Sequence, residues 1–126
     1  MTIDEVIERV DERKPNAFSG RDKAEWLSAL DGRIAANVFL WPPAEFGALR
    51  YTYPDDGGRV LLIDPPHDDI YVYWLMAKID EANGEYNKYQ NTMQTYNELY
   101  GDFVRWFAGL YDPAQGYDRR RYHGIV

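Results

Sequence analysis

The stretch that decides the fold is 86-YNKYQNTMQTYNELYGDFVRWFAGL-110, because large apolar side chains recur along it at alternating intervals of three and four residues. The repeating positions are Tyr86, Tyr89, Met93, Tyr96, Tyr100, Phe103, Phe107 and Leu110. This spacing is that of the a and d positions of a heptad, which share one face of an α-helix. The sequence therefore predicts a helix from Glu85 to Leu110, about 39 Å long at about 1.5 Å per residue.

A second apolar helix is predicted directly before it, from about His67 to Ala82. Residues 70–79 are apolar on nearly all sides, which is typical of a helix that is covered on more than one face. Asn83 and Gly84 then close this helix, since glycine readily takes the left-handed conformation. We therefore expect the two helices to pack against each other as a helical hairpin.

Two further helices are predicted in the N-terminal third of the chain. Thr2 and Glu5 have the spacing of a capping box at the start of the first helix. The second helix runs from about Arg21 to Phe39, after a cap at Ser19 or Asp22.

A small β-hairpin is predicted over about residues 49–63. Leu49, Tyr51 and Tyr53 alternate with polar or small residues, and residues 60–63 form a short apolar run. Residues 54–58 between them, PDDGG, have turn chemistry.

The composition excludes several classes of function and several types of site. A chain of 126 residues suits one domain, and 45% hydrophobic residues exclude disorder of the whole chain. The net charge of −7 disfavours general binding to nucleic acid. The lack of cysteine excludes disulfides, thiolate zinc sites and a cysteine nucleophile. No apolar run reaches the roughly 20 residues that span a bilayer, so we expect no membrane contact.

Residues for catalysis are few. Two histidines and two serines leave little material for a Ser-His-acid arrangement, and Gly57-Gly58 lacks the residues that complete a phosphate loop. We therefore expect no enzymatic activity, no catalytic residue and no cofactor.

One group of residues has the composition of a hard-metal site: Asp64, His67, Asp68 and Asp69. Carboxylates in the first turn of a helix are also expected from the helix dipole alone. We favour capping over metal binding, with the two prolines of 64-DPPHDD-69 in the first turn.

Together these patterns predict a mainly α fold of about four helices with a long C-terminal helix, a small β-hairpin and an extended C-terminal tail. Residues 1–112 would form the helical domain and residues 113–126 an extended arm. The charge changes near this boundary: residues 1–110 have a net charge of −8, and residues 111–126 have a net charge of +1.

The aromatic repeat admits two interpretations. It packs inside the subunit, or it contacts a partner subunit, where tyrosine is enriched. We assign helix packing or interface contacts to Tyr96, Tyr100, Phe103, Trp106 and Phe107.

The tail also admits two interpretations. It is a solvated segment, or it is an arm that docks on an acidic neighbour. As docking residues we choose Tyr117, Arg119, Arg120, Arg121 and Tyr122.

Three stretches carry a resemblance to a known group of proteins: 67-HDDIYVYWLMAKID-80, 83-NGEYNKYQN-91 and 96-YNELYGDF-103. Together with the N-terminal run 2-TIDEVIERVDERKPN-16 and with 26-WLSALDG-32, they resemble the head-tail connector proteins of long-tailed bacteriophages and prophages, also called adaptor or head-completion proteins. The resemblance covers most of the chain outside residues 42–58 and the tail.

The resemblance implies a structural protein of the virion neck, which would be found in the host cytoplasm during assembly. Such subunits form a ring of about twelve copies beneath the portal and bridge the portal protein and a tail-side completion protein. DNA would pass through the central channel without specific binding, and an acidic ring would let it slide.

The acidic charge is also compatible with a different class of function. A small acidic interaction module or regulator, of the antitoxin kind, could bind a basic partner through its acidic surface.

Overall fold

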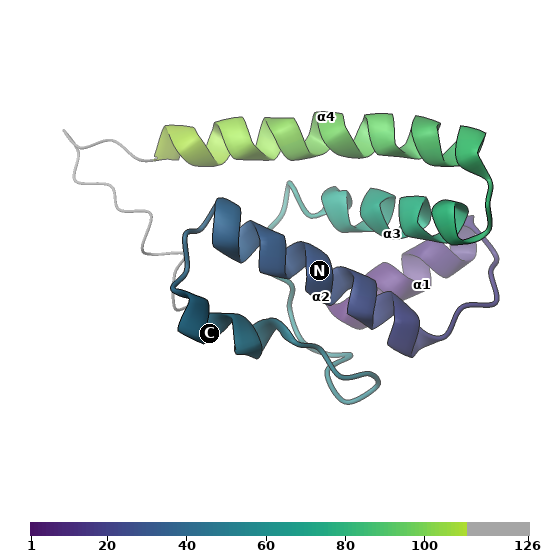
Figure 1. Cartoon of the computed structure of the whole chain (residues 1–126), viewed down its shortest axis with the longest axis horizontal. Helices are drawn as coiled ribbons and strands as arrows, with labels where there is room; N and C mark the ends of the chain where they lie inside the picture. Colours follow the sequence, from purple (N-terminus) through teal and green to yellow (C-terminus); the bar gives the residue numbers. More distant parts are fainter. Residues whose placement is uncertain (111–126) are drawn as a thin grey trace.

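The computed structural model describes residues 1–110, which form a mainly helical fold (Figure 1). Its elements are α1 (Ile3–Arg13), α2 (Gly20–Asn37), the 3-10 helix η1 (Pro43–Leu49), α3 (Asp69–Ala82) and α4 (Tyr86–Leu110). The four α-helices expected from the sequence are thus confirmed, with small differences at their ends. The arm of residues 113–126 lies outside the described residues.

Helices α3 and α4 form the expected helical hairpin and lie antiparallel to each other (Figure 1). Gly84 closes α3 with a φ of +73°, in the left-handed region that glycine tolerates. The Glu85 amide then donates a hydrogen bond to the Asp80 carbonyl at 2.9 Å. Because α4 is longer than α3, its C-terminal half continues beyond the hairpin and meets the end of α2.

The N-terminal caps explain where α1 and α2 begin. The Thr2 hydroxyl accepts the Glu5 amide at 3.2 Å and the Glu5 carboxylate accepts the Thr2 amide, as the capping box predicts. Of the two candidates for the second cap, Ser19 is the one that accepts the Asp22 amide. A side chain therefore satisfies an otherwise unpaired amide at the start of each helix.

The predicted β-hairpin is wrong. Within residues 1–110 no strand ladder forms, and the apolar run after the turn bridges to the N-terminus instead: Val60 pairs with Thr2, and the Leu61 amide donates to the Met1 carbonyl. Residues 54–58 form a local turn closed by the Asp56 amide on the Thr52 carbonyl at 2.7 Å. This turn and the N-terminal bridge use backbone groups that a hairpin would have needed.

The expected start of α3 also needs correction. Pro65 and Pro66 precede the helix instead of occupying its first turn, and the helix begins at Asp69. Asp68 is the N-cap residue, but its side chain makes no capping hydrogen bond. The carboxylate of Asp69 does lie in the first turn, where the helix dipole favours it.

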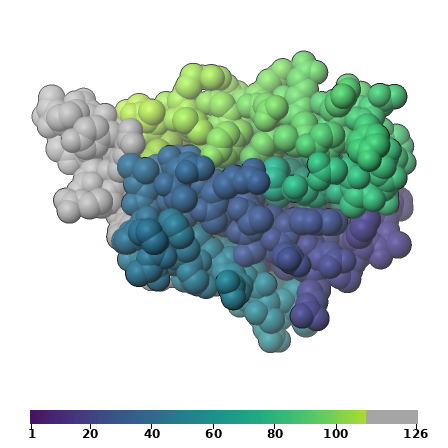
Figure 2. Space-filling model, viewed as in Figure 1, coloured from purple at the N-terminus to yellow at the C-terminus, as the bar shows by residue number. Residues whose placement is uncertain are grey.

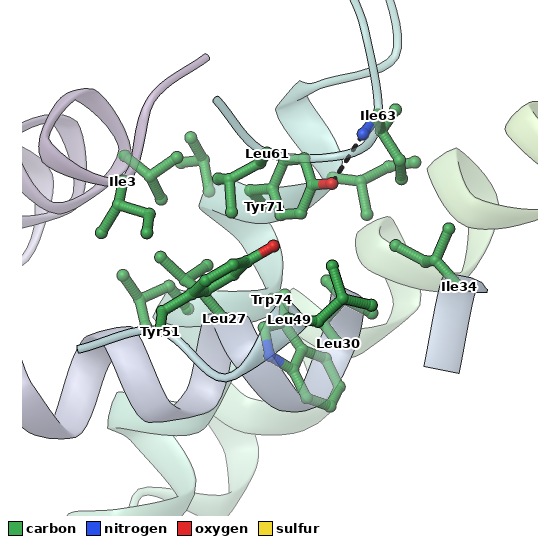
Figure 3. Packing of buried hydrophobic residues seen from close by; sticks show 14 of the residues in the cluster. Ile3, Leu27, Leu30, Ile34, Leu49, Tyr51, Leu61, Ile63, Tyr71 and Trp74 are labelled. Atoms are coloured by element: carbon green, nitrogen blue, oxygen red, sulfur yellow. Dashed lines mark hydrogen bonds between the residues drawn. The ribbon is translucent and has the colours of Figure 1, made fainter. Parts of the chain in front are cut away.

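One hydrophobic core joins all the helices, with contributions from Ile3 of α1, Leu30 of α2, Leu49 of η1 and Leu75 of α3. Figure 3 shows how these elements direct their apolar side chains into a shared interior. In the space-filling view, α4 and α2 close against each other on the face shown (Figure 2). Phe39 follows α2 two residues after its last residue, and its ring centroid lies 6.3 Å from that of Phe103 and 5.0 Å from that of Phe107.

The buried rings of α4 supply the first prediction. Phe103 is 2% exposed, so Phe103→Ala leaves a cavity and should lower the free energy of unfolding by about 3 to 5 kcal/mol. Gln94→Ala, an exposed position on the same helix, should change it by less than about 0.5 kcal/mol. Urea unfolding of both variants measures these differences, and equal losses would contradict the assignment of Phe103 to the core.

Candidate functional site

The residues that the sequence assigns to packing or an interface lie at different depths along α4. Tyr96, Phe103 and Phe107 are buried, and Tyr100 is half-buried. Trp106 is 42% exposed, although it lies between two buried positions in sequence. The C-terminal half of the repeat therefore packs mainly inside the subunit, and Trp106 is the member of this set that offers a large ring to a partner. A partner contact through these residues stays a prediction.

The docking residues that the sequence proposes, Tyr117, Arg119, Arg120, Arg121 and Tyr122, lie outside the described residues. The segment that carries them follows Leu110, the last residue of α4. Trp106 is one helical turn before that point, so the exposed ring and the start of the C-terminal segment belong to the same end of the helix.

His67 joins this end of α4 from the loop before α3. Its ring lies 4.7 Å from the ring of Trp106 and 5.6 Å from that of Phe103, measured between centroids. The His67 Nδ1 atom is buried and has no hydrogen-bond partner among residues 1–110. We call His67, Phe103 and Trp106 the aromatic end of α4.

A second aromatic cluster stiffens the middle of the hairpin. The ring centroids of Trp74 and Tyr96 lie 5.2 Å apart, and the Tyr96 ring stacks on that of Tyr100 with 5.7 Å between their centroids. Cations cover Trp74, with the Arg33 guanidinium at 5.2 Å and the Lys78 ammonium at 4.6 Å from the ring centroid. Burial raises the pKa of Tyr96 to about 12, so its hydroxyl stays protonated at neutral pH.

The buried polar centre of the molecule is the Asp31 carboxylate on α2. It accepts hydrogen bonds from the Tyr51 hydroxyl and, at 2.6 Å, from the Tyr71 hydroxyl on α3. The Leu62 amide also donates to it, at 3.3 Å. The Tyr71 hydroxyl in turn accepts the Ile63 amide at 2.7 Å, the interaction dashed in Figure 3. We call Asp31, Tyr51 and Tyr71 the Asp31 centre.

Burial dominates the electrostatics of the Asp31 centre. Asp31 is fully buried, and desolvation raises its pKa to about 6, although the two tyrosine hydroxyls and the Leu62 amide oppose this by stabilising the charged form. Burial also raises the pKa of the Tyr51 and Tyr71 hydroxyls, and the negative charge of Asp31 raises both pKa values further. Both phenols therefore remain hydrogen-bond donors at neutral pH.

The Asp31 centre was not anticipated from the sequence, although a signal for it exists. Asp31 lies four residues after Leu27 and three before Ile34, so it occupies the apolar stripe of α2. A carboxylate inside such a stripe must find buried hydrogen-bond donors, since an unpaired buried charge is very costly. Which donors those are depends on the tertiary fold.

A buried ion pair connects the first helix to the hairpin. The Lys14 ammonium lies 2.6 Å from Oδ1 of Asp80, whose side chain is fully buried near the end of α3. The Thr92 hydroxyl of α4 donates to Oδ2 of the same carboxylate at 3.3 Å. Asp80 therefore holds α1, α3 and α4 together at the turn end of the hairpin.

Residues 1–110 hold no cluster of three or more metal-ligating side chains, including the Asp64 to Asp69 region that the sequence singles out. No helix in this range is long and apolar enough to cross a membrane.

Comparison with protein-family models, with curated proteins and with solved structures gives no match for this chain.

The Asp31 centre generates a prediction for the pH dependence of stability. A folded-state pKa near 6, above the ordinary value of 3.8, means that the native state holds this proton more tightly than the unfolded state. The resulting stabilisation is complete below about pH 4 and is lost as pH rises through 6. Between pH 4 and pH 7 the free energy of unfolding of the wild type should therefore fall by on the order of 3 kcal/mol relative to that of Asp31→Asn.

Urea unfolding at a series of pH values measures this difference. Asp55→Asn, at an exposed loop position, serves as the control and should follow the wild type at every pH. Parallel curves for the wild type and Asp31→Asn would show that Asp31 does not titrate in this range.

Proposed function

We propose that this chain is a structural virion protein, a head-tail connector subunit that assembles as a ring beneath the portal. In this role it bridges the portal protein and a tail-side completion protein and surrounds the DNA exit channel. The main support is that three of the five stretches resembling connector proteins lie within residues 67–103, which form α3, the loop that enters it and most of α4. The larger part of the resemblance thus falls on one structural unit, the α3–α4 hairpin, and the rest falls on α1 and α2.

The hairpin has the rigidity that a ring component needs. Its inner side is held by the Phe39, Phe103 and Phe107 rings at one end and by the Lys14 ion pair with Asp80 at the other. Close-packed aromatic contacts of this kind resist bending, because side chains in a dense core have no free volume to move into. A helix fixed at both ends can hold a docking segment in a defined position.

The aromatic end of α4 supplies the proposed contact. Trp106 exposes part of a large ring directly before the C-terminal segment that contains Tyr117 and the run Arg119 to Arg121. Tryptophan, tyrosine and arginine are the residues that most often carry the binding energy of interfaces. We therefore assign portal docking to this end of the helix together with the segment that follows it.

The charge of the described part fits a channel through which DNA moves. Residues 1–110 contain eleven basic and nineteen acidic residues, a net charge of −8. A ring of such subunits presents like charge to the phosphate backbone, which disfavours tight binding and permits sliding.

Deletion of residues 116–126 tests the docking segment. The shortened chain should keep the helical circular dichroism and thermal unfolding of the full chain, because it retains all the core residues found within residues 1–110. It should no longer attach to purified portal rings of the same virus, as seen by electron microscopy of the mixture. Attachment equal to that of the full chain would contradict the proposal.

Trp106→Ala tests the aromatic end of α4 separately. Loss of a partly exposed tryptophan from the centre of an interface should weaken attachment to portal rings by about tenfold or more. The matched control is Tyr86→Ala, which removes another exposed ring from the opposite end of the same helix and should leave attachment unchanged. Equal weakening by both variants would argue against a contact centred on Trp106.

A further inference from the structure

An open groove of about 710 Å³ lies between α2 and the segment that follows η1. Helix α2 lines one wall with Arg21, Glu25, Ser28 and Ala29. The other wall is the segment 50–53, which consists of Arg50, Tyr51, Thr52 and Tyr53. The groove shares none of the residues assigned above to portal docking.

Hydrogen bonds hold the 50–53 wall in place. The Ser28 hydroxyl donates to the Leu49 carbonyl and accepts the Tyr51 amide at 3.4 Å, and the Tyr51 hydroxyl is fixed on Asp31. A ligand would therefore meet a preformed surface, which reduces the ordering cost of binding.

Tyr53 closes the wall against the start of α2. Its ring lies so close to Gly20 that a Cβ atom there would come within 2.3 Å of it. Its hydroxyl donates to the Asp4 carboxylate at 3.0 Å. Glycine at position 20 is thus what allows the ring to approach the helix.

The two arginines of the groove have no side-chain partner among residues 1–110. Among the cations of residues 1–110, most form an ion pair or cover an aromatic ring: Lys14, Lys23, Arg33, Arg59, Lys78, Lys88 and Arg105. Within the same range, Arg9, Arg13, Arg21 and Arg50 do neither, and of these four Arg21 and Arg50 lie together along the groove. In a chain with a net charge of −7, two unpaired guanidinium groups in one groove indicate an anionic ligand.

Glu25 decides which class of anion fits. It lines the same groove, so a densely charged phosphate backbone would place negative charge against it, and the acidic surface would repel nucleic acid as a whole. In a polypeptide, neutral residues can separate the acidic ones, so a neutral residue of the ligand can lie next to Glu25. The geometry therefore favours an acidic peptide segment over nucleic acid.

The backbone of the wall offers further contacts to an extended peptide. Within residues 1–110, the Tyr53 amide and the carbonyls of Arg50 and Tyr51 form no hydrogen bond. Arg50 has extended backbone dihedral angles, and unpaired backbone groups of this kind can pair with an extended chain.

We propose that this groove binds an extended acidic segment of a partner protein, with carboxylates paired to Arg21 and Arg50 and with Tyr53 as an aromatic contact. This inference does not depend on the connector role, because it uses a different face and different residues.

Fluorescence anisotropy with labelled hexaglutamate tests the groove on the full chain at low ionic strength. The wild type should bind hexaglutamate and should not bind hexaglutamine. Arg21→Gln combined with Arg50→Gln should weaken binding by about tenfold or more, since two charge-assisted contacts are lost. Glu25→Gln should strengthen it by about twofold or more, because it removes a like charge from the groove.

The matched control is Arg9→Gln combined with Arg13→Gln, which removes the same charge from exposed positions on α1. The affinity of this control variant for hexaglutamate should differ from that of the wild type by less than about twofold. An equal loss in the control would mean that hexaglutamate follows bulk charge, which overturns the proposal, as would absence of binding to the wild type. Tighter binding of oligothymidylate, or full displacement of hexaglutamate by equimolar inorganic phosphate, would show that the groove prefers phosphate groups and would also overturn it.

Discussion

The burial of one carboxylate organises this fold. Asp31 lies in the apolar stripe of α2, and it can remain buried only because Tyr51, Tyr71 and the Leu62 amide donate to it. Two of these donors, Tyr51 and the Leu62 amide, belong to the irregular segment between η1 and α3. Their hydrogen bonds to Asp31 fix this segment to the helices without forming a sheet. The same constraint fixes the 50–53 wall of the groove.

The aromatic residues of α4 divide the helix into parts with different roles. Phe103 and Phe107 are buried, whereas Trp106 is partly exposed beside His67. Packing of the first two against Phe39 holds the helix, and the exposed ring is available for contact. The heptad positions of α4 therefore serve the stability of the subunit, and Trp106, which lies outside the heptad positions, serves in our proposal its attachment to the portal.

Local sequence signals predicted the helices well and the connecting segment poorly. The capping box at Thr2, the glycine at position 84 and the heptad spacing of α4 act within a few residues of each other, so the sequence contains them fully. The pairing of Val60 with Thr2 joins residues far apart in the chain, and alternation alone does not specify a partner. The groove was missed for the same reason, because its walls come from two distant segments.

The hydrogen bonds of the Asp31 centre also bear on how this sequence can evolve. Replacing either tyrosine by phenylalanine removes a donor from a buried charge, and replacing Asp31 by an apolar residue leaves two buried hydroxyls without their acceptor. A change that removes a donor or the acceptor at one of the three positions should thus lower the free energy of unfolding unless the others change as well. Homologous sequences should therefore show positions 31, 51 and 71 covarying.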